Sequence, residues 1–427
     1  MELKNNIIIR NAKIIDVNSK HHNSKKDVLI INGIIKEIKK NIEFELPYFE
    51  IKKNNLHISP GWIDLHTRLG EPGLEHRETI ITGLKSAADG GFTSVVVMPN
   101  TNPPVDKKSE VIFLLKEGAD NIVEVLPTGC VTEKCQQKKI SEMYDMHLHG
   151  AIAFTDDKKN IQNAKLMSIA LEYVKNFKGL IMTTNLDNNF NKNGQINEGV
   201  VSTELGLEPS PELSEDLMVM RNLKLLEYTN SKLHLSTIST KNSLRQIKAA
   251  KTKKLKVSSD VAAHQLILND ESLRNFDTNL KVMPPLRDEL TRKALIKGIK
   301  DGIIDAISSD HSPIEIESKK CEFNKAEFGI IGLETVFPIT NTILKDDLKL
   351  EEIIQLISSN PRQILGIKQP IIIENQKANI TLFDPDLKWY YQEDDIQSLS
   401  KNSPFINHQF TGKSLGIINK GDVYIKE

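Results

Sequence analysis

The chain has 427 residues, in which 56 Lys and Arg nearly balance 57 Asp and Glu. That length exceeds one small core and suits one large domain with a smaller companion. Because the charges cancel and no long block of one sign occurs, nucleic acid and anionic membranes are excluded as favoured partners.

The three cysteines, Cys130, Cys135 and Cys321, are few and unevenly spaced. Their pattern argues against a disulfide framework and fits a reducing compartment, so each is interpreted as a structural thiol. The sequence contains no run of 18 apolar residues, and its N-terminal segment lacks a small-residue cleavage site. We therefore expect a soluble, cytoplasmic protein that makes no membrane contact.

In chain order, the first pattern is that of β-hairpins. Residues 6–42 hold short Ile- and Val-rich runs, broken by Asn-Gly and by a polar loop. The C-terminal stretches ANITLFDPD and SLGIINKGDVYIKE repeat that texture. We therefore predict a small β-sandwich domain formed by both termini, with residues 1–58 as its first part and 369–427 as its second.

Residues 59–368 follow a different pattern, in which short apolar runs alternate with amphipathic segments. Segments such as RETIITGLKSAADG have the i, i+3, i+4 apolar spacing of surface helices. The apolar runs fall at 61–67, 91–100, 122–130, 150–157, 179–185, 232–239, 256–262 and 302–310. Eight β/α units in about 250 residues are what a (β/α)8 barrel requires. The predicted fold class is α/β, a TIM-like barrel with a small β domain.

A barrel fold also predicts where chemistry occurs, because the active residues of such barrels lie at the C-terminal ends of the strands. Those ends carry polar residues in this sequence, namely His66 with Arg68, Asn100, Asp157, Thr184, Thr237 and Asp310. Polar side chains at the ends of several strands exceed what loops alone would give. We therefore predict that they share one pocket.

The same strand ends carry a family resemblance. The stretches PGWIDLHTRLGEPGLEHRETI, GGFTSVVVMPNTNPPVD, GAIAFTDD, LHLSTIST and DAISSDHSP together resemble the dihydroorotase family of the amidohydrolase superfamily. The resemblance implies a zinc enzyme that interconverts dihydroorotate and carbamoyl aspartate in pyrimidine synthesis. In such a site zinc lowers the pKa of bound water to about 7 and polarises the amide carbonyl, while an Asp moves the proton.

The resemblance also implies a set of zinc ligands: a His-x-His pair after strand 1, an acidic group after strand 4, one His each after strands 5 and 6, and an Asp after strand 8. His66 matches the first His of the pair, and Asp157 matches the strand-4 ligand. Asp310 matches the last Asp, which is implied as both a metal ligand and the catalytic acid/base. Arg68 occupies the position of the second His of the pair, and Thr184 and Thr237 occupy the positions of the histidines after strands 5 and 6.

The substrate contacts implied by the resemblance are only partly present. Asn100 matches the substrate-binding Asn of the family. Gly70, Met283 and Ile314 stand where the family has Arg, Asn and His. A carboxylate substrate would therefore lose its bidentate Arg contact.

The replacements argue against a binuclear zinc centre. Threonine hydroxyls are poor zinc ligands, and a guanidinium is always protonated and cannot coordinate a metal. Arg68 lies two residues from His66 on one strand, so both side chains face the same interior. We therefore expect the Arg68 guanidinium to occupy the space of the metal and to bridge Asp157 or Asp310.

Other histidines could replace the missing ligands. His264, at the end of the seventh strand, is the best spare candidate. His147 and His149 have His-x-His spacing but precede a strand, so we expect them at the opposite face of the barrel. His234 is interpreted as a hydrogen-bonded core residue, and His311 as a residue that supports the fold beside Asp310.

Two main interpretations follow. In the first, the chain is a non-catalytic dihydroorotase homologue that binds no cofactor and serves as a structural or regulatory partner, by analogy with inactive relatives that support aspartate transcarbamoylase. In the second, it is an active dihydroorotase with one unusually ligated zinc, in which Asp310 is the acid/base and Asn100 binds the substrate. Hydantoinase or allantoinase activity is a weaker third option. A homo-oligomer is expected in each case, and residues 314–328 are expected to form a mobile loop at the pocket mouth.

Overall fold

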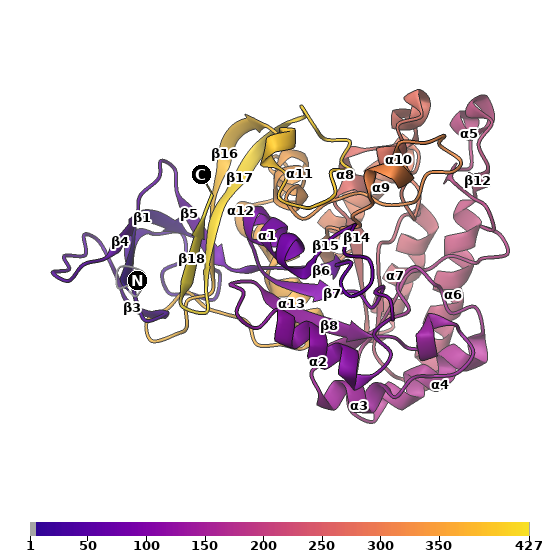
Figure 1. The fold of residues 1–427 in the computed structure, drawn as a ribbon, viewed down its shortest axis with the longest axis horizontal. Coiled ribbons are helices and arrows are strands. Elements are labelled where there is room, and N and C mark those ends of the chain that lie inside the picture. Colours follow the sequence, from indigo (N-terminus) through magenta and orange to yellow (C-terminus); the bar gives the residue numbers. More distant parts are fainter. Residues whose placement is uncertain (1–5, 427) are drawn as a thin grey trace.

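The computed structural model describes residues 6–426 and has eight parallel strands in a nearly closed barrel (Figure 1). The strands are β6 (Trp62–Thr67), β7 (Phe92–Val97), β8 (Glu124–Gly129), β9 (Ala153–Phe154), β10 (Ile181–Thr183), β13 (Leu233–Leu235), β14 (Val257–Ala262) and β15 (Ala306–Ser308). Each is hydrogen-bonded to the next in that order. The predicted (β/α)8 barrel is confirmed, and each of the eight predicted runs contains one of these strands.

The barrel closes at the C-terminal ends of its first and last strands. Thr67, at the end of β6, forms a parallel bridge with His311. The backbone N–H of Arg68 donates to the carbonyl oxygen of His311 at 3.0 Å, and the N–H of His311 donates to the carbonyl oxygen of His66 at 3.1 Å. These bonds fix the positions from which the predicted site residues of β6 and β15 project.

Helices cover the outside of the barrel. The longer ones are α1 (Ile80–Gly90), α2 (Lys108–Glu117), α4 (Ala164–Lys175), α6 (Glu212–Thr229), α7 (Lys241–Thr252), α9 (Glu289–Lys300), α11 (Val336–Leu344), α12 (Leu350–Ile357) and α13 (Ser359–Leu365). The N-cap side chains of Thr240 and Asp288 accept from the backbone N–H of Ser243 and Thr291, which satisfies free donors at the starts of α7 and α9. Gly91, with φ 92°, ends α1 in the left-handed conformation that glycine adopts at little cost.

Both termini form the second domain, a mainly antiparallel sheet (Figure 1). Its strands are β1 (Asn6–Ile14), β2 (Lys25–Ile31), β3 (Ile34–Lys39), β4 (Phe49–Ile51), β5 (His57–Pro60), β16 (Ile380–Tyr390), β17 (Gln409–Asn419) and β18 (Asp422–Ile425). Pairing of β5 with β16 joins the two ends of the chain in one sheet. A β domain built from both termini is therefore confirmed.

Trp62, the first residue of β6, joins the two domains. Its fully buried ring lies 4.6 Å from the ring of Phe337 on α11 and 5.5 Å from that of Phe383 on β16, measured between centroids. Its indole N–H donates to Ser59 Oγ at 3.0 Å. This shared aromatic packing attaches the sheet to the N-terminal end of the barrel, away from the strand ends that carry the predicted site.

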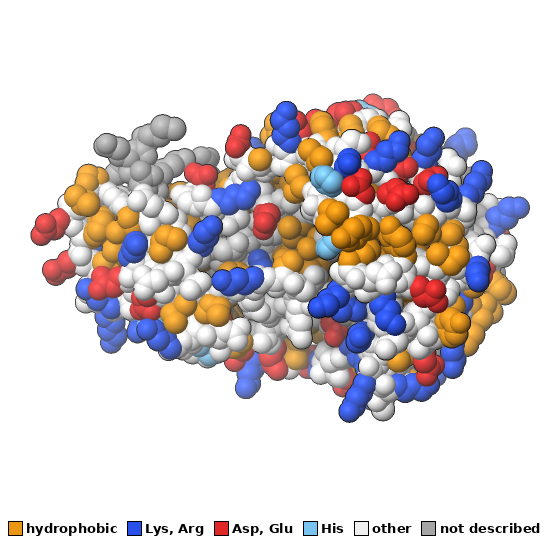
Figure 2. Space-filling model, turned by 90° about the horizontal axis from the view of Figure 1, so that it is seen from below, with side chains coloured by type: hydrophobic (Ala, Val, Ile, Leu, Met, Phe, Trp, Pro, Cys, Tyr) orange, Lys and Arg blue, Asp and Glu red, His pale blue; other side chains and the backbone are white. Residues whose placement is uncertain are grey.

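The surface agrees with the balanced composition. Figure 2 shows basic and acidic side chains interspersed over the face that it presents, with apolar side chains between them. Within residues 6–426, no helix is long and apolar enough to cross a membrane.

Candidate functional site

A cavity of about 890 Å³ lies at the C-terminal ends of the barrel strands. Arg68, Asn100, Asp157 and Asp310 line it, together with Gly70, Met283 and Ile314, which replace family contacts. His66, Thr184 and Thr237 are buried beside this lining rather than within it. The structure therefore brings the predicted residues to one end of the barrel, although three of them do not face the cavity.

Arg68 makes a two-pronged ion pair with Asp157. Arg68 Nε donates to Asp157 Oδ2 at 2.7 Å, and one terminal nitrogen donates to Oδ1 at 2.9 Å. The other terminal nitrogen donates to Ser312 Oγ at 2.6 Å. All three guanidinium nitrogens are thus engaged in the bidentate geometry that makes Arg–carboxylate pairs strong. Of the two predicted partners, Asp157 is the one that Arg68 hydrogen-bonds.

His66 connects the two retained carboxylates. Its Nε2 lies 2.8 Å from Asp157 Oδ1 and 3.7 Å from Asp310 Oδ1. An ionised carboxylate can only accept, so the Nε2 atom of His66 carries the proton and donates it to Asp157. The other ring nitrogen, Nδ1, is buried and has no hydrogen-bond partner among the described atoms.

Lys158 is a second cation at this end of the barrel, and sequence reasoning missed it. Its Nζ lies 2.9 Å from Asp310 Oδ1 and 3.0 Å from Oδ2, and it donates to the carbonyl oxygen of Met283 at 2.6 Å. Its position directly after Asp157, at the end of a barrel strand, was the available signal. Each retained carboxylate therefore has its own side-chain cation, Arg68 for Asp157 and Lys158 for Asp310.

These contacts decide the charge state of both carboxylates. Burial alone would raise the pKa of Asp157, but Arg68 and His66 outweigh it and hold the pKa well below its ordinary value. Burial likewise opposes ionisation of Asp310, and Lys158, followed by His66 and Arg68, lowers its pKa below the ordinary value. Both groups are therefore ionised at neutral pH, and the two carboxylates and two cations cancel in charge.

Thr184 and Thr237, at the two positions where the resemblance implies histidines, both take part in hydrogen bonds of the backbone. Thr184 Oγ1 donates to the carbonyl oxygen of Asp157 at 2.7 Å and lies 2.9 Å from Asn160 Oδ1. The backbone N–H of Thr237 donates to Asp260 Oδ1 at 3.0 Å, while its buried Oγ1 has no partner among the described atoms. Among the described residues neither hydroxyl hydrogen-bonds Asp310 or His66; the Thr184 hydroxyl supports the end of β9, whereas Thr237 is held through its backbone.

The remaining histidines follow the sequence analysis in most respects. His234 is fully buried and lies 2.7 Å from Asp260 and 2.9 Å from Ser258, as expected of a core residue. His147 and His149 belong to the short helix α3 (Met143–Leu148) and its C-cap and do not line the cavity. His264 is buried, and burial lowers its pKa to about 4, so its imidazole is neutral at pH 7.

The zinc implied by the family resemblance does not fit this arrangement. The Asp157 oxygens that would face a metal accept hydrogen bonds from Arg68 and His66, and Lys158 lies against both oxygens of Asp310. A metal-bound histidine normally donates its second ring N–H to a polar partner, whereas Nδ1 of His66 has none. A divalent ion would have to displace two cations from an already neutral cluster.

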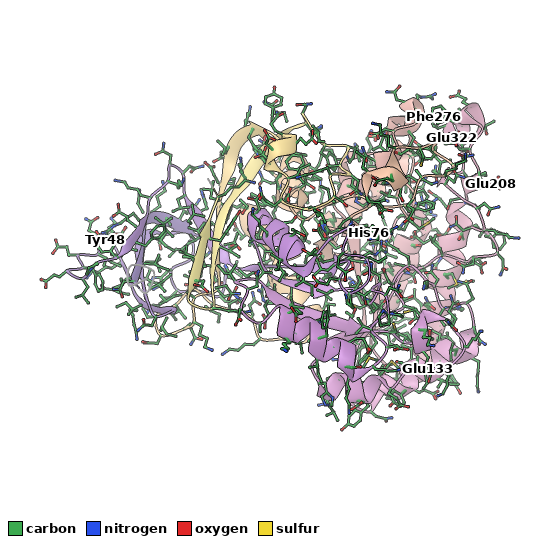
Figure 3. All side chains as sticks on the ribbon, in the orientation of Figure 1. Tyr48, His76, Glu133, Glu208, Phe276 and Glu322 are labelled. Carbon is green, nitrogen blue, oxygen red and sulfur yellow. The ribbon has the colours of Figure 1, made fainter. Side chains whose placement is uncertain are left out.

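The segment 314–328 lies at the cavity mouth and is tied to its surroundings. Arg77 pairs with Glu315 at 2.7 Å and with Glu327 at 2.9 Å. The ring centroids of Phe276 and Phe323 lie 6.4 Å apart, and Figure 3 labels Phe276 and Glu322 close together at the upper right of the molecule. The expected mobility of this segment stays a prediction.

We expect Arg68→Ala to lower the free energy of unfolding by about 3–5 kcal/mol at pH 7, because it leaves Asp157 buried without its cation. Chemical denaturation measures this. Without Arg68 only His66 opposes the effect of burial, so the pKa of Asp157 rises in the variant, whereas the stability that the ion pair gives the wild type is lost only below about pH 4. The difference in the free energy of unfolding between the wild type and Arg68→Ala should therefore become smaller as the pH falls from 7 toward 4.

Arg245→Ala, at an exposed arginine, is the control and should change the free energy of unfolding by less than about 0.5 kcal/mol. An equal loss in both variants would contradict the role of the ion pair.

His264 gives a separate pH dependence. Its folded pKa of about 4 lies below an unfolded value of about 6.5, so the unfolded chain takes up the proton first and stability falls as the pH drops between these values. We expect this group to contribute a loss of about 3 kcal/mol over that range. Denaturation curves recorded across this pH range give the free energy of unfolding, which should fall with pH by this amount more in the wild type than in His264→Asn. His76→Asn, at an exposed histidine, should keep the wild-type slope, and parallel profiles for the wild type and His264→Asn would refute the assignment.

Known proteins resemble this chain in sequence over almost its full length. The Dihydro-orotase-like family model matches residues 56–243. The dihydroorotase of Caldicellulosiruptor saccharolyticus is 39% identical over 426 residues, which cover 99% of each chain. The dihydroorotase of Geotalea daltonii is 37% identical over 423 residues, again with 99% of each chain covered.

Solved structures extend the likeness of the fold. The L-hydantoinase of Arthrobacter aurescens superposes with a TM-score of 0.86 at 20% identity, covering 98% of this chain and 96% of the other. The dihydropyrimidinase of Brevibacillus agri superposes with a TM-score of 0.82 at 18% identity, covering 99% of this chain and 95% of the other. The barrel, the β domain formed by both termini and the full-length similarity to curated relatives lead to one conclusion: this chain belongs to the dihydroorotase family of amidohydrolases.

Proposed function

We propose that this chain is a non-catalytic member of the dihydroorotase family, in which two side-chain cations take the place of the metal centre. The observation that carries this proposal is the pairing of Arg68 with Asp157 and of Lys158 with Asp310, at 2.7–3.0 Å. Both carboxylates that match the family's ligands are occupied by groups that cannot bind water as a metal does.

Hydrolysis of a cyclic amide needs an activated water and a base that takes its proton. Zinc lowers the pKa of a bound water to about 7, whereas a guanidinium or ammonium only donates hydrogen bonds. The base is also weakened here, because Lys158 and the neighbouring cations lower the pKa of Asp310 and hold it as a carboxylate with little affinity for a proton. These two points support the proposal that the chain does not hydrolyse a cyclic amide.

The cavity itself persists and supports a binding role. Its volume is about 890 Å³, and Asn100, whose buried Oδ1 has no hydrogen-bond partner among the described atoms, is one of the lining residues. A small polar molecule related to dihydroorotate or carbamoyl aspartate could be held there without turnover. The partner role belongs to the same proposal: the chain acts as a folded support, with aspartate transcarbamoylase as the first candidate, and sedimentation of the mixed proteins tests that association.

Turnover is the direct test. We expect the purified chain to form no carbamoyl aspartate from dihydroorotate above the uncatalysed rate, with or without added zinc, because no group replaces the metal-activated water. Chromatographic detection of the product measures this. The dihydroorotase of Caldicellulosiruptor saccharolyticus, assayed in parallel, verifies the conditions. Turnover that rises with zinc would refute the proposal and favour the active, single-zinc enzyme.

Restoring the ligands tests the cause. We expect a variant with R68H, K158A, T184H and T237H to bind zinc between His66, Asp157 and Asp310, because two cations are removed and three imidazoles return. Anomalous scattering at the zinc edge locates the ion. The matched control adds H66A and should lose the peak. A folded variant without zinc at this place would show that the two cations are not what excludes the metal.

A further inference from the structure

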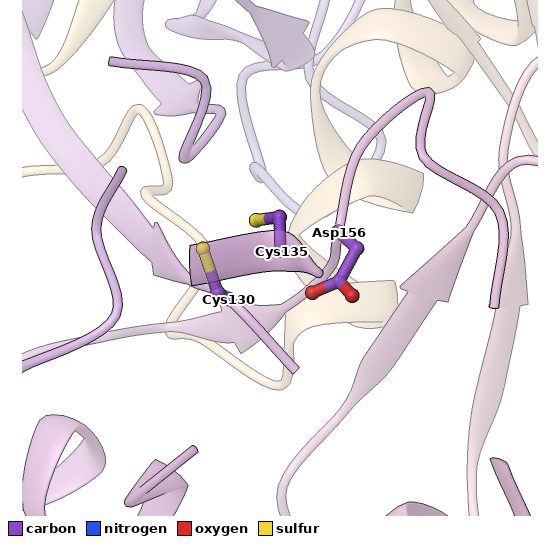
Figure 4. Close-up of side chains that lie close together, drawn as sticks. All are labelled: Cys130, Cys135 and Asp156. Atoms are coloured by element: carbon purple, nitrogen blue, oxygen red, sulfur yellow. The ribbon is translucent and has the colours of Figure 1, made fainter. Parts of the chain in front are cut away.

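A second group of metal-ligating side chains lies beside the cavity, in the loops that follow β8 and β9 (Figure 4). The two Sγ atoms of Cys130 and Cys135 and a carboxylate oxygen of Asp156 all lie within 4.8 Å of one another. All three residues are buried. From this geometry we propose that Cys130, Cys135 and Asp156 bind one zinc ion, at a site separate from the residues that match the family's ligands.

The donor set suits a soft, tetrahedral metal. Zinc accepts thiolate sulfur at about 2.3 Å and carboxylate oxygen at about 2.0–2.2 Å, which places two bound sulfurs about 3.8 Å apart. The two sulfurs therefore have to approach each other by about 1 Å at most, and each sulfur and the carboxylate oxygen by about 1.2 Å at most. On binding, Zn²⁺ displaces one proton from each thiol, so two protons are released and the ion is held by two thiolates and one carboxylate.

Asp156 is already oriented as a ligand. Its Oδ1 accepts the backbone N–H groups of Val131 at 2.8 Å and Thr132 at 2.9 Å, and its Oδ2 accepts the hydroxyl of Thr132. A carboxylate has about four acceptor positions, and the Cys135 thiol also hydrogen-bonds this carboxylate, so the metal would take the place of that thiol proton. Ligating carboxylates are commonly held by hydrogen bonds of this kind, which fix the carboxylate before the metal arrives.

The loop that carries Cys135 adopts an unusual backbone. Lys134, Cys135 and Gln137 have φ values of 53°, 49° and 61°, in the left-handed region that residues other than glycine rarely adopt. The loop is held there by the N–H of Lys134, which donates to Asp106 Oδ2 at 2.8 Å, and by that of Gln137, which donates to Thr132 Oγ1 at 3.0 Å. Strained backbone conformations are common at binding sites, and in this loop they occur where the Cys135 side chain is buried beside Cys130 and Asp156.

The site has access to the cavity. Cys135 and Asp156 line it, while Cys130 lies behind them and is fully buried. Three protein ligands leave one coordination position of a tetrahedral ion open, and water or a ligand in the cavity can fill it. The metal would thus lie next to the cluster of Arg68, Lys158 and their carboxylates, and its binding does not depend on whether that cluster hydrolyses a substrate.

Cobalt titration tests the proposal on the full chain, reduced and stripped of metal with a chelator. We expect one equivalent of Co²⁺ to produce a thiolate-to-cobalt absorption band in the near ultraviolet, and added Zn²⁺ to remove it. C130S and C135S should each abolish the band and weaken zinc binding by more than the about 100-fold that loss of a supporting group can cause. C321S, at an exposed thiol, and H66A, at the matched family ligand, should keep the band.

The opposite results are equally clear. No band at stoichiometric cobalt, or a band that persists in C130S or C135S, overturns the proposal. A band lost in H66A and kept in C135S would place the metal at the family position, and it would overturn the proposed function as well as this site. Circular dichroism checks the folding of each variant. If either cysteine variant unfolds, zinc-edge anomalous scattering from wild-type crystals decides: a peak bonded to both Cys130 and Cys135 supports the site, and its absence refutes it.

Discussion

Two ionised carboxylates buried at one end of a barrel require cations beside them, and this requirement organises the site. Taking an unpaired carboxylate out of water costs several kcal/mol, so a folded chain cannot keep Asp157 and Asp310 there alone. Here a guanidinium from the end of β6 and an ammonium from the loop after β9 meet the requirement. Within this cluster the two cations balance the charges of the two carboxylates.

The backbone is shaped to bring these charges together. Asp157 and Asp310 have φ values of 53° and 48°, so the chain turns sharply at the end of each strand. Asp tolerates this conformation better than most residues. The Thr184 hydroxyl donates to the carbonyl oxygen of Asp157 and so holds one of these turns.

The sequence predicted the features that depend on periodicity and strand position. Eight apolar runs were enough for the barrel, and the two-residue spacing of His66 and Arg68 placed both side chains on one face. Lys158 was missed because it follows a left-handed residue, where strand alternation no longer gives the side-chain direction. Cys130 and Cys135 were interpreted as structural thiols, and Asp156 was not singled out, because only the pairing of β8 with β9 brings their loops together. The predicted roles of Asp310 and Asn100 depend on chemistry that spacing alone does not determine.

The separate pairing of Arg68 with Asp157 and of Lys158 with Asp310 has an evolutionary consequence. Loss of either cation alone leaves its carboxylate buried and unpaired. A single substitution at Arg68 or Lys158 therefore weakens the fold before a second substitution can compensate, which restricts the order in which this site can change.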